Sequence, residues 1–311
     1  MLKRKFLKKV WIAISCLIVI QIVAMFPKND DKDFTIKPSS STGIIYLLDD
    51  NNYVSRLEIM YNATKKEDLV REIISILTIN SDKSVRIRSG FTPIIPENTE
   101  LLDLKIEDEQ VTLNFSKDIL LIDEELEEKM IEAIVYSITS IDGIDYVKLL
   151  VENQALEKLP HSSKKLPDVL DRSMGINKEY DIETLSNIKE TTIYYLARNN
   201  DYTYYIPVTK YSNDTKEKIE IIIDELKSSS TYNTNLISYL NEETELINYE
   251  FLDSSMILNF NDSILADINS NNIIEEVTYT INLSVQENYD VNNVIYYVDD
   301  QVNANYFLPR G

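Results

Sequence analysis

An internal repeat restricts the folds open to this 311-residue chain more than any other feature of its sequence. Three segments recur in the same order, each displaced by about 145 to 148 residues. The pairs are 111–120 (VTLNFSKDIL) with 256–265 (MILNFNDSIL), 45–52 (IYLLDDNN) with 193–200 (IYYLARNN), and 147–154 (VKLLVENQ) with 294–301 (VIYYVDDQ). Similar segments that recur in the same order at a nearly constant spacing indicate a tandem duplication, so the chain should fold as two similar units.

Each copy has the hydrophobic pattern of a mixed fold. Alternation of apolar and polar residues over 110–116 predicts a strand with one buried face, whereas the spacing of Met130, Ile134 and Ile138 predicts a helix. Each copy therefore reads β-β-α-β-β-α-β, an α+β sandwich with helices on one sheet face. The expected strands are 44–48, 53–60, 101–107, 110–116 and 145–152, then 192–198, 202–209, 245–252, 256–261 and 292–298; the expected longer helices are 123–141 and 271–287.

A shorter helix is expected after the first two strands of each copy. Thr64-Lys-Lys-Glu67 has the pattern of a capping box, in which the Thr hydroxyl and the Glu carboxylate each satisfy a free backbone N–H. Asp214-Thr-Lys-Glu217 repeats this pattern in the second copy. The apolar residues that follow keep helical spacing in both copies.

The amino-terminal residues predict a membrane anchor. Residues 1–9 carry five basic side chains, and residues 10–26 follow without a charge, long enough to cross a bilayer. The basic residues favour a cytoplasmic N-terminus, which would place the remainder outside a single-pass span in the cell membrane. The alternative is a lipoprotein lipidated at Cys16, which follows a small residue, although the apolar run before it is short for a signal peptide.

The remaining boundaries follow from composition and from the repeat. We expect a polar tether at 27–42, the first domain at 43–154, a linker at 155–187, the second domain at 188–302 and a tail at 303–311. The linker is long for an ordinary loop and contains apolar residues. Part of it should pack on a domain and fix the two units relative to each other.

The composition leaves little catalytic apparatus. With one His and one Cys the chain has no disulfide framework, no Cys/His metal cluster and no Cys–His pair, and we expect no cofactor. A formal net charge of −21 argues against nucleic acid as a partner. His161 is expected in an exposed loop. The acidic pairs are interpreted as solvated surface: Asp49/Asp50, Glu124/Glu125, Glu127/Glu128, Glu275/Glu276 and Asp299/Asp300.

Tyrosine is unusually common, with 20 residues, and several gather on two strands of the second copy. Alternate positions would place several rings on one face, which is consistent with core packing, with cross-strand pairing or with an exposed contact patch. Tyr202 and Tyr204 are the candidate interaction surface. If they form an exposed patch, serine at both positions should weaken association with a partner without unfolding the domain.

The order of four segments resembles the GerMN domain and, with two copies, sporulation and spore germination proteins of the GerM type. The segments are Gly90–Leu102, Val111–Ser116, Gly143–Glu152 and Asp171–Asn177. The resemblance implies a non-enzymatic extracytoplasmic protein that resembles ring-building modules. Its implied partners are envelope-complex proteins of sporulation and further copies of itself. A glycan-binding or hydrolytic cell-wall ectodomain remains the alternative.

Overall fold

The computed structural model describes residues 41–199, 202–228, 235–267 and 272–307. The first copy starts with the antiparallel hairpin of β1 (Ser41–Asp49) and β2 (Val54–Tyr61), with β3 (Phe91–Thr92) at the free edge of β1. A second sheet holds β4 (Leu101–Glu107), β5 (Gln110–Phe115), β6 (Tyr146–Val151) and β7 (Gln154–Ala155) in that order. The helices are α2 (Lys66–Leu77) and α3 (Glu127–Ile138).

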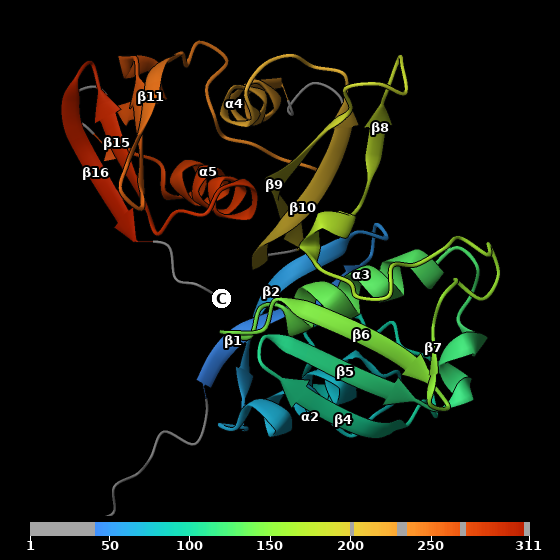
Figure 1. Cartoon of the computed structure of the whole chain (residues 1–311). Helices are drawn as coiled ribbons and strands as arrows, with labels where there is room; N and C mark the ends of the chain where they lie inside the picture. The colour runs from blue at the N-terminus through green and yellow to red at the C-terminus, as the bar shows by residue number, and fades with distance from the viewer. Residues whose placement is uncertain (1–40, 200–201, 229–234, 268–271, 308–311) are drawn as a thin grey trace, which may run out of the picture. The chain divides into compact units, whose positions relative to one another are not determined.

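The second copy repeats this arrangement (Figure 1). Its hairpin is β9 (Lys189–Asn199) with β10 (Tyr202–Ser212), and its helices are α4 (Lys218–Ser228) and α5 (Glu275–Asn288). Its second sheet has the order β11 (Leu246–Leu252), β12 (Ser255–Phe260), β15 (Asn293–Val298) and β16 (Gln301–Phe307). Two short strands, β13 (Leu265–Asp267) and β14 (Asn272–Ile273), precede α5.

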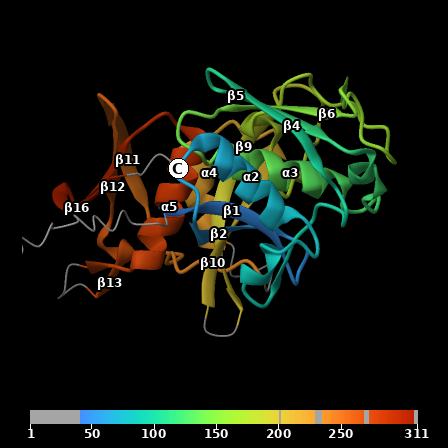
Figure 2. The same ribbon diagram turned by 90° about the horizontal axis from the view of Figure 1, so that it is seen from below.

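The helices of each copy lie between two layers of strands. Figures 1 and 2 show α2 and α3 between the β1–β2 hairpin and the β4–β5–β6 sheet, and Figure 1 shows α4 and α5 in the same place in the second copy. The core between these layers includes Phe115, Ile134 and Leu113, all fully buried. The expected order of elements is confirmed, but the strands form two layers around the helices and not one sheet with helices on one face.

Both copies contain a final strand that the sequence analysis did not predict. β7 pairs with β6, and β16 pairs with β15 along its length, so residues 303–307 continue a strand and the prediction of a tail there was wrong. The predicted helix at 123–141 was too long: α3 spans Glu127 to Ile138, because residues 124–126 form a turn ahead of it and Thr139 caps its end.

The Asn of the repeated Leu-Asn-Phe motif has a structural role in both copies. The Asn114 side chain donates to Asn153 Oδ1 and accepts from the Asn153 backbone N–H, both at 2.9 Å. In the second copy Asn259 makes the same two contacts with Asp300, at 2.7 and 3.2 Å. Residues 153 and 300 have positive φ in the turns after β6 and β15. The motif therefore fixes the turn that leads into the final strand of each copy.

The predicted capping box of the first copy does not form. Lys65 is the N-cap of α2 and makes no side-chain capping bond. Glu72, farther along the helix, accepts instead from the backbone N–H groups of Asn62 and Ala63, at 3.0 and 2.9 Å. In the second copy Asp214 Oδ1 accepts from Lys216 N–H at 2.9 Å, which makes a turn ahead of α4.

Glu72 gives the first copy an acid-dependent stability. Burial alone would raise its pKa, but the hydrogen bond from Arg86 at 2.6 Å, the two backbone N–H groups and nearby Lys83 hold the pKa below its ordinary value. A lowered carboxyl pKa contributes stability above the unfolded-state pKa of about 4.3, and this contribution is lost as the pH falls through the folded-state pKa.

Glu72→Gln should therefore destabilise the protein by about 1 to 3 kcal/mol at neutral pH, because the buried donors lose a charged acceptor. The difference in urea midpoint between the wild type and this variant should shrink as the pH is lowered from about 7 to about 3. Glu97→Gln, at an exposed loop position, is the control. A difference that stays constant over this pH range would contradict the assignment.

The predicted membrane anchor at 10–26, the tether up to residue 40 and Cys16 lie outside the described residues. Within the part of the chain that the structure describes, no helix has the length and apolar character needed to cross a membrane.

Candidate functional site: the junction between the copies

The two copies meet through equivalent strands. β2 of the first copy and β10 of the second pair antiparallel, with Arg56 opposite Tyr205, so both hairpins belong to one sheet. β8 (Glu179–Asp181), from the linker, adds in parallel to the same side of β10. Nothing in the local sequence pattern of either hairpin indicated this shared sheet.

A chain of hydrogen-bonded side chains crosses the contact between the copies: Tyr46, Tyr194, Glu287 and Arg172. We call these four residues, together with Asn177, the inter-copy junction. The Tyr46 and Tyr194 hydroxyl oxygens lie 2.9 Å apart, and the Tyr194 hydroxyl donates to Glu287 Oε2 at 3.0 Å. Because the Tyr194 proton goes to Glu287, Tyr46 must donate to Tyr194. Arg172 Nη1 closes the chain on the same Glu287 oxygen at 2.8 Å.

Arg172 connects the ends of the two long helices. Besides Glu287 of α5, its guanidinium donates to the Thr139 and Ser140 hydroxyls at the end of α3, at 2.9 and 2.8 Å. The guanidinium carbon lies 4.9 Å from the centre of the Tyr136 ring. Burial alone would lower the pKa of Arg172, but Glu287 raises it above its ordinary value, so the residue stays charged.

Asn177 joins three segments within a few ångströms. Its side-chain oxygen accepts from Val54 N–H at 2.9 Å, and its amide nitrogen donates to the carbonyl oxygens of Val54 and Pro207, both at 2.8 Å. Its backbone N–H donates to Glu132 at 3.0 Å. Val54 belongs to the first copy and Pro207 to the second, so this linker residue links both copies through one amide.

Next to Asn177, a buried ion pair attaches the linker to α3. Lys178 Nζ lies 2.6 Å from carboxylate oxygens of both Glu128 and Glu132, and the Glu132 side chain is 3% exposed. Burial disfavours the Lys178 charge, but Glu132 and Glu128 raise its pKa above the ordinary value. The expectation that part of the 155–187 linker packs on a domain is confirmed, and the linker residues Leu159, Leu170 and Ile176 are also buried.

A cleft of about 710 Å³ opens beside the junction. Equivalent segments of both copies line it: 139–143 at the end of α3 and 286–291 at the end of α5, with Tyr46, Tyr194 and Arg172. Both helix ends present backbone carbonyl groups, which favours a positive charge between them. Arg172, from the linker, supplies that charge.

Tyr204 lies in the core and not on an exposed patch. Its side chain is 3% exposed, its hydroxyl donates to Asp49 Oδ2 at 2.9 Å, and its ring meets Phe91 edge-on with centres 4.8 Å apart. Tyr202 is partly buried beneath Arg88, whose guanidinium carbon lies 4.3 Å from the ring centre. Asp49, Phe91 and Arg88 belong to the first copy, so this aromatic face is used for packing between the copies. Serine at position 204 was expected to leave the fold intact only if Tyr204 lay on an exposed patch. Because Tyr204 is buried, that condition does not hold, and serine there should disturb the packing between the copies.

Comparisons with known proteins agree with this architecture. Residues 44–157 match the family described as Germane: sporulation and spore germination. The chain is 30% identical over 276 residues to the spore germination protein GerM of Bacillus subtilis (strain 168), an alignment that covers 86% of this chain and 75% of that protein. The chain belongs to the GerM family of sporulation and spore germination proteins. The solved tandem GerMN domains of GerM from Bacillus subtilis superpose with a TM-score of 0.79 and 25% identity, covering 88% of this chain and 98% of that one.

The remaining candidates from the sequence occupy structural positions in this member of the GerM family. His161 is exposed, with Nε2 2.7 Å from the Ile122 carbonyl oxygen. Glu127, from one acidic pair, accepts from the backbone N–H groups of His161 and Ser162. Asp300, from another, closes the turn after β15. Over residues 41–199, 202–228, 235–267 and 272–307, no group of three or more His, Cys, Asp or Glu is placed to hold a metal ion.

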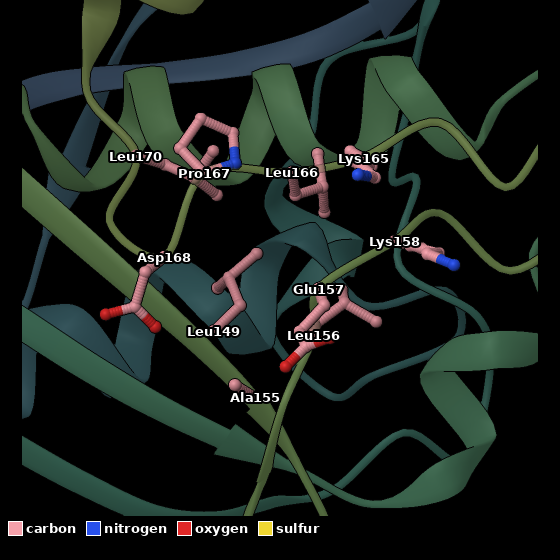
Figure 3. A pocket seen from close by; sticks show the side chains of 10 residues that line it. All are labelled: Leu149, Ala155, Leu156, Glu157, Lys158, Lys165, Leu166, Pro167, Asp168 and Leu170. Atoms are coloured by element: carbon pink, nitrogen blue, oxygen red, sulfur yellow. The ribbon is translucent and has the colours of Figure 1, made fainter.

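A smaller pocket of about 310 Å³ lies where the linker packs on β6. Figure 3 shows the side chains of Leu149, Leu156 and Leu166 turned toward the same space, with Lys158 and Lys165 at its margin. Asp168, on its wall, pairs with Lys148 at 2.8 Å. The pocket lies at the packing interface between the first GerMN copy and the linker, and its lining residues do not form a recognisable catalytic group.

The junction residues themselves were not identified from the sequence. Tyr46 and Tyr194 occupy the same position in the repeated segments 45–52 and 193–200, which was the one available signal. Arg172 and Asn177 lie inside Asp171–Asn177, a segment used only to support the GerMN resemblance. Their role depends on partners 30 or more residues away in the chain, and hydrophobic periodicity does not report such distant contacts.

Proposed function

We propose that this GerM-family protein acts as a non-enzymatic assembly module, tethered to the membrane by its amino-terminal segment and stabilising an envelope complex during sporulation or germination. The observation that carries the proposal is the fixed pairing of two GerMN copies by the inter-copy junction. Such a pairing presents the outer surfaces of both copies in one defined geometry, which suits a protein that positions partners.

The edge strand β11 is the surface best suited to partner contact. It is the terminal strand of its sheet within the described residues, and it exposes Ile247, Phe251 and Leu252 at 52%, 52% and 58%. An exposed strand edge with apolar side chains is a template for pairing with another chain. The corresponding strand β4 of the first copy is more polar, because Asp103, Lys105 and Glu107 occupy exposed positions.

Crosslinking and co-purification of the tagged full-length chain from sporulating cells tests the proposal. The wild type should co-purify with envelope proteins, and Ile247→Lys with Leu252→Lys should reduce their recovery about tenfold, because a charge at the contact opposes apolar burial. Leu121→Lys, at a position that is 73% exposed in the first copy, is the control and should retain the partners.

One outcome would contradict the assembly proposal, and another would contradict only the assignment of β11 as its contact surface. The first is a wild-type chain that captures no envelope protein but is retained on purified peptidoglycan, which would favour the glycan-binding or hydrolytic alternative. The second is a β11 double variant that recovers its partners as well as the wild type does, which would exclude β11 as the contact surface.

A further inference from the structure

The inter-copy junction brings together the same residue from each copy. Tyr46 and Tyr194 are equivalent in the repeat, and their hydroxyl groups contact each other. The surroundings are equivalent as well: the Tyr46 N–H donates to the Ser137 hydroxyl of α3, and the Tyr194 N–H donates to the Ser284 hydroxyl of α5, both at 2.9 Å. A contact in which a residue meets its own equivalent is the mark of an isologous interface, the kind formed by two-fold symmetric dimers.

The backbone has the same relation as the side chains. The equivalent strands β2 and β10 pair antiparallel at Arg56 and Tyr205, which lie in the first half of their strands. The equivalent helix ends, 139–143 and 286–291, line one cleft. Strand pairing, helix ends and tyrosines thus all relate the copies as a local two-fold axis would.

We propose that the tandem is an internal dimer: the face around Tyr46 in one copy and Tyr194 in the other is a self-complementary recognition surface for a GerMN copy, and it holds the copies together without the covalent link. The partner of each copy's face is therefore another GerMN copy. This inference does not depend on the proposed assembly function, because it concerns contacts within one chain.

The buried state of the face supports non-covalent association. Tyr46, Tyr194 and Tyr136 are 1%, 2% and 0% exposed, so the contact excludes water as the core of a stable interface does. The linker adds contacts that break the symmetry, since Arg172 and Asn177 are present once and contact both copies. Arg172 and Asn177 therefore favour one relative orientation of the two faces.

The experiment is to cut the full chain between its copies. Residues 183–187 are exposed, and Leu185 is 93% exposed, so a specific protease site inserted after Leu185 would be accessible. After complete cleavage, native mass spectrometry and size-exclusion chromatography at about 1 μM should show a complex of one fragment of each kind, with a dissociation constant well below that concentration. Fragments that separate at this concentration would overturn the proposal.

Variants of the cleavable chain locate the contact. Arg172→Met should raise the dissociation constant of the cleaved complex about 30-fold, and Tyr194→Phe, which removes one hydroxyl, about 5-fold. Arg71→Met, at an exposed position on α2, should change it less than about twofold. Tyr46→Phe combined with Tyr194→Phe should be less than additive, because both remove the same hydrogen bond. Affinities unchanged by the junction variants would show that the fragments associate through another surface, contrary to the proposal.

Discussion

Asn177→Leu is expected to destabilise the protein by about 4 kcal/mol, the largest effect of any single change considered. Leucine removes the one acceptor and two donors of the amide, so Val54 N–H, Val54 C=O and Pro207 C=O lose their side-chain partner. Val54 is fully buried, and each buried polar group left without a partner costs about 1 to 3 kcal/mol. The urea midpoint, followed by far-ultraviolet circular dichroism, measures the loss.

Backbone conformation contributes separately to this effect. Asn177 has φ of +46°, and a side chain other than Asn or Gly in this left-handed region costs about 1 to 2 kcal/mol. Asn98→Leu is the matched control, because Asn98 has φ of +67° and is exposed. A loss of stability that is equal in the two variants would show that the Asn177 amide contributes nothing beyond its backbone conformation.

Arg172→Met is expected to destabilise the protein by about 2 to 3 kcal/mol. Methionine keeps much of the side-chain length but leaves Glu287, which is 7% exposed, without its cation. Breaking a fully buried ion pair costs about 3 to 5 kcal/mol, and the estimate is reduced here because the Arg172 side chain is 31% exposed. The free energy of unfolding in urea is the measurement.

A second substitution separates the ion pair from packing. Glu287→Gln in the Arg172→Met background removes the uncompensated charge, so it should recover part of the lost stability. In that double variant the Tyr194 hydroxyl can still donate to the side-chain oxygen of the introduced glutamine. Failure to recover any stability would show that Arg172 acts through its contacts with Thr139, Ser140 and the Tyr136 ring instead.

Much of each copy was predictable because its signals are local. Alternation at Val111, Leu113 and Phe115 specified β5, and helical spacing from Met130 to Ile138 specified α3. The turn at 49–52 followed from its Asp and Asn residues, and Asp49 Oδ1 accepts from two backbone N–H groups there. Such patterns depend on neighbours within a few residues, so they are visible in the sequence.

Errors arose where a distant contact competed with a local rule. Thr64 and Glu67 fit a capping box, but Glu72 satisfies the N–H groups ahead of α2 because the chain leaving β2 passes beside it. The alternating pattern correctly placed Tyr204 on one face of a strand. Alternation does not show, however, whether that face contacts solvent or contacts Phe91 and Asp49 of the other copy. The final strand β16 was missed because it is defined by its pairing with β15 and not by a pattern within its own residues.

The amino-acid sequence is sufficient to identify a duplication, to predict a mixed α+β unit in each copy and to place the protein with the GerM family, because motifs and periodicity along the chain carry these properties. The folded chain was needed to show that equivalent faces of the copies meet at Tyr46 and Tyr194, with Arg172 and Asn177 joining them. This difference arises from the separation of the interacting residues along the chain. The free energy of that junction comes from hydrogen bonds and burial between residues as much as 148 positions apart, and such contacts leave no periodic trace in the sequence.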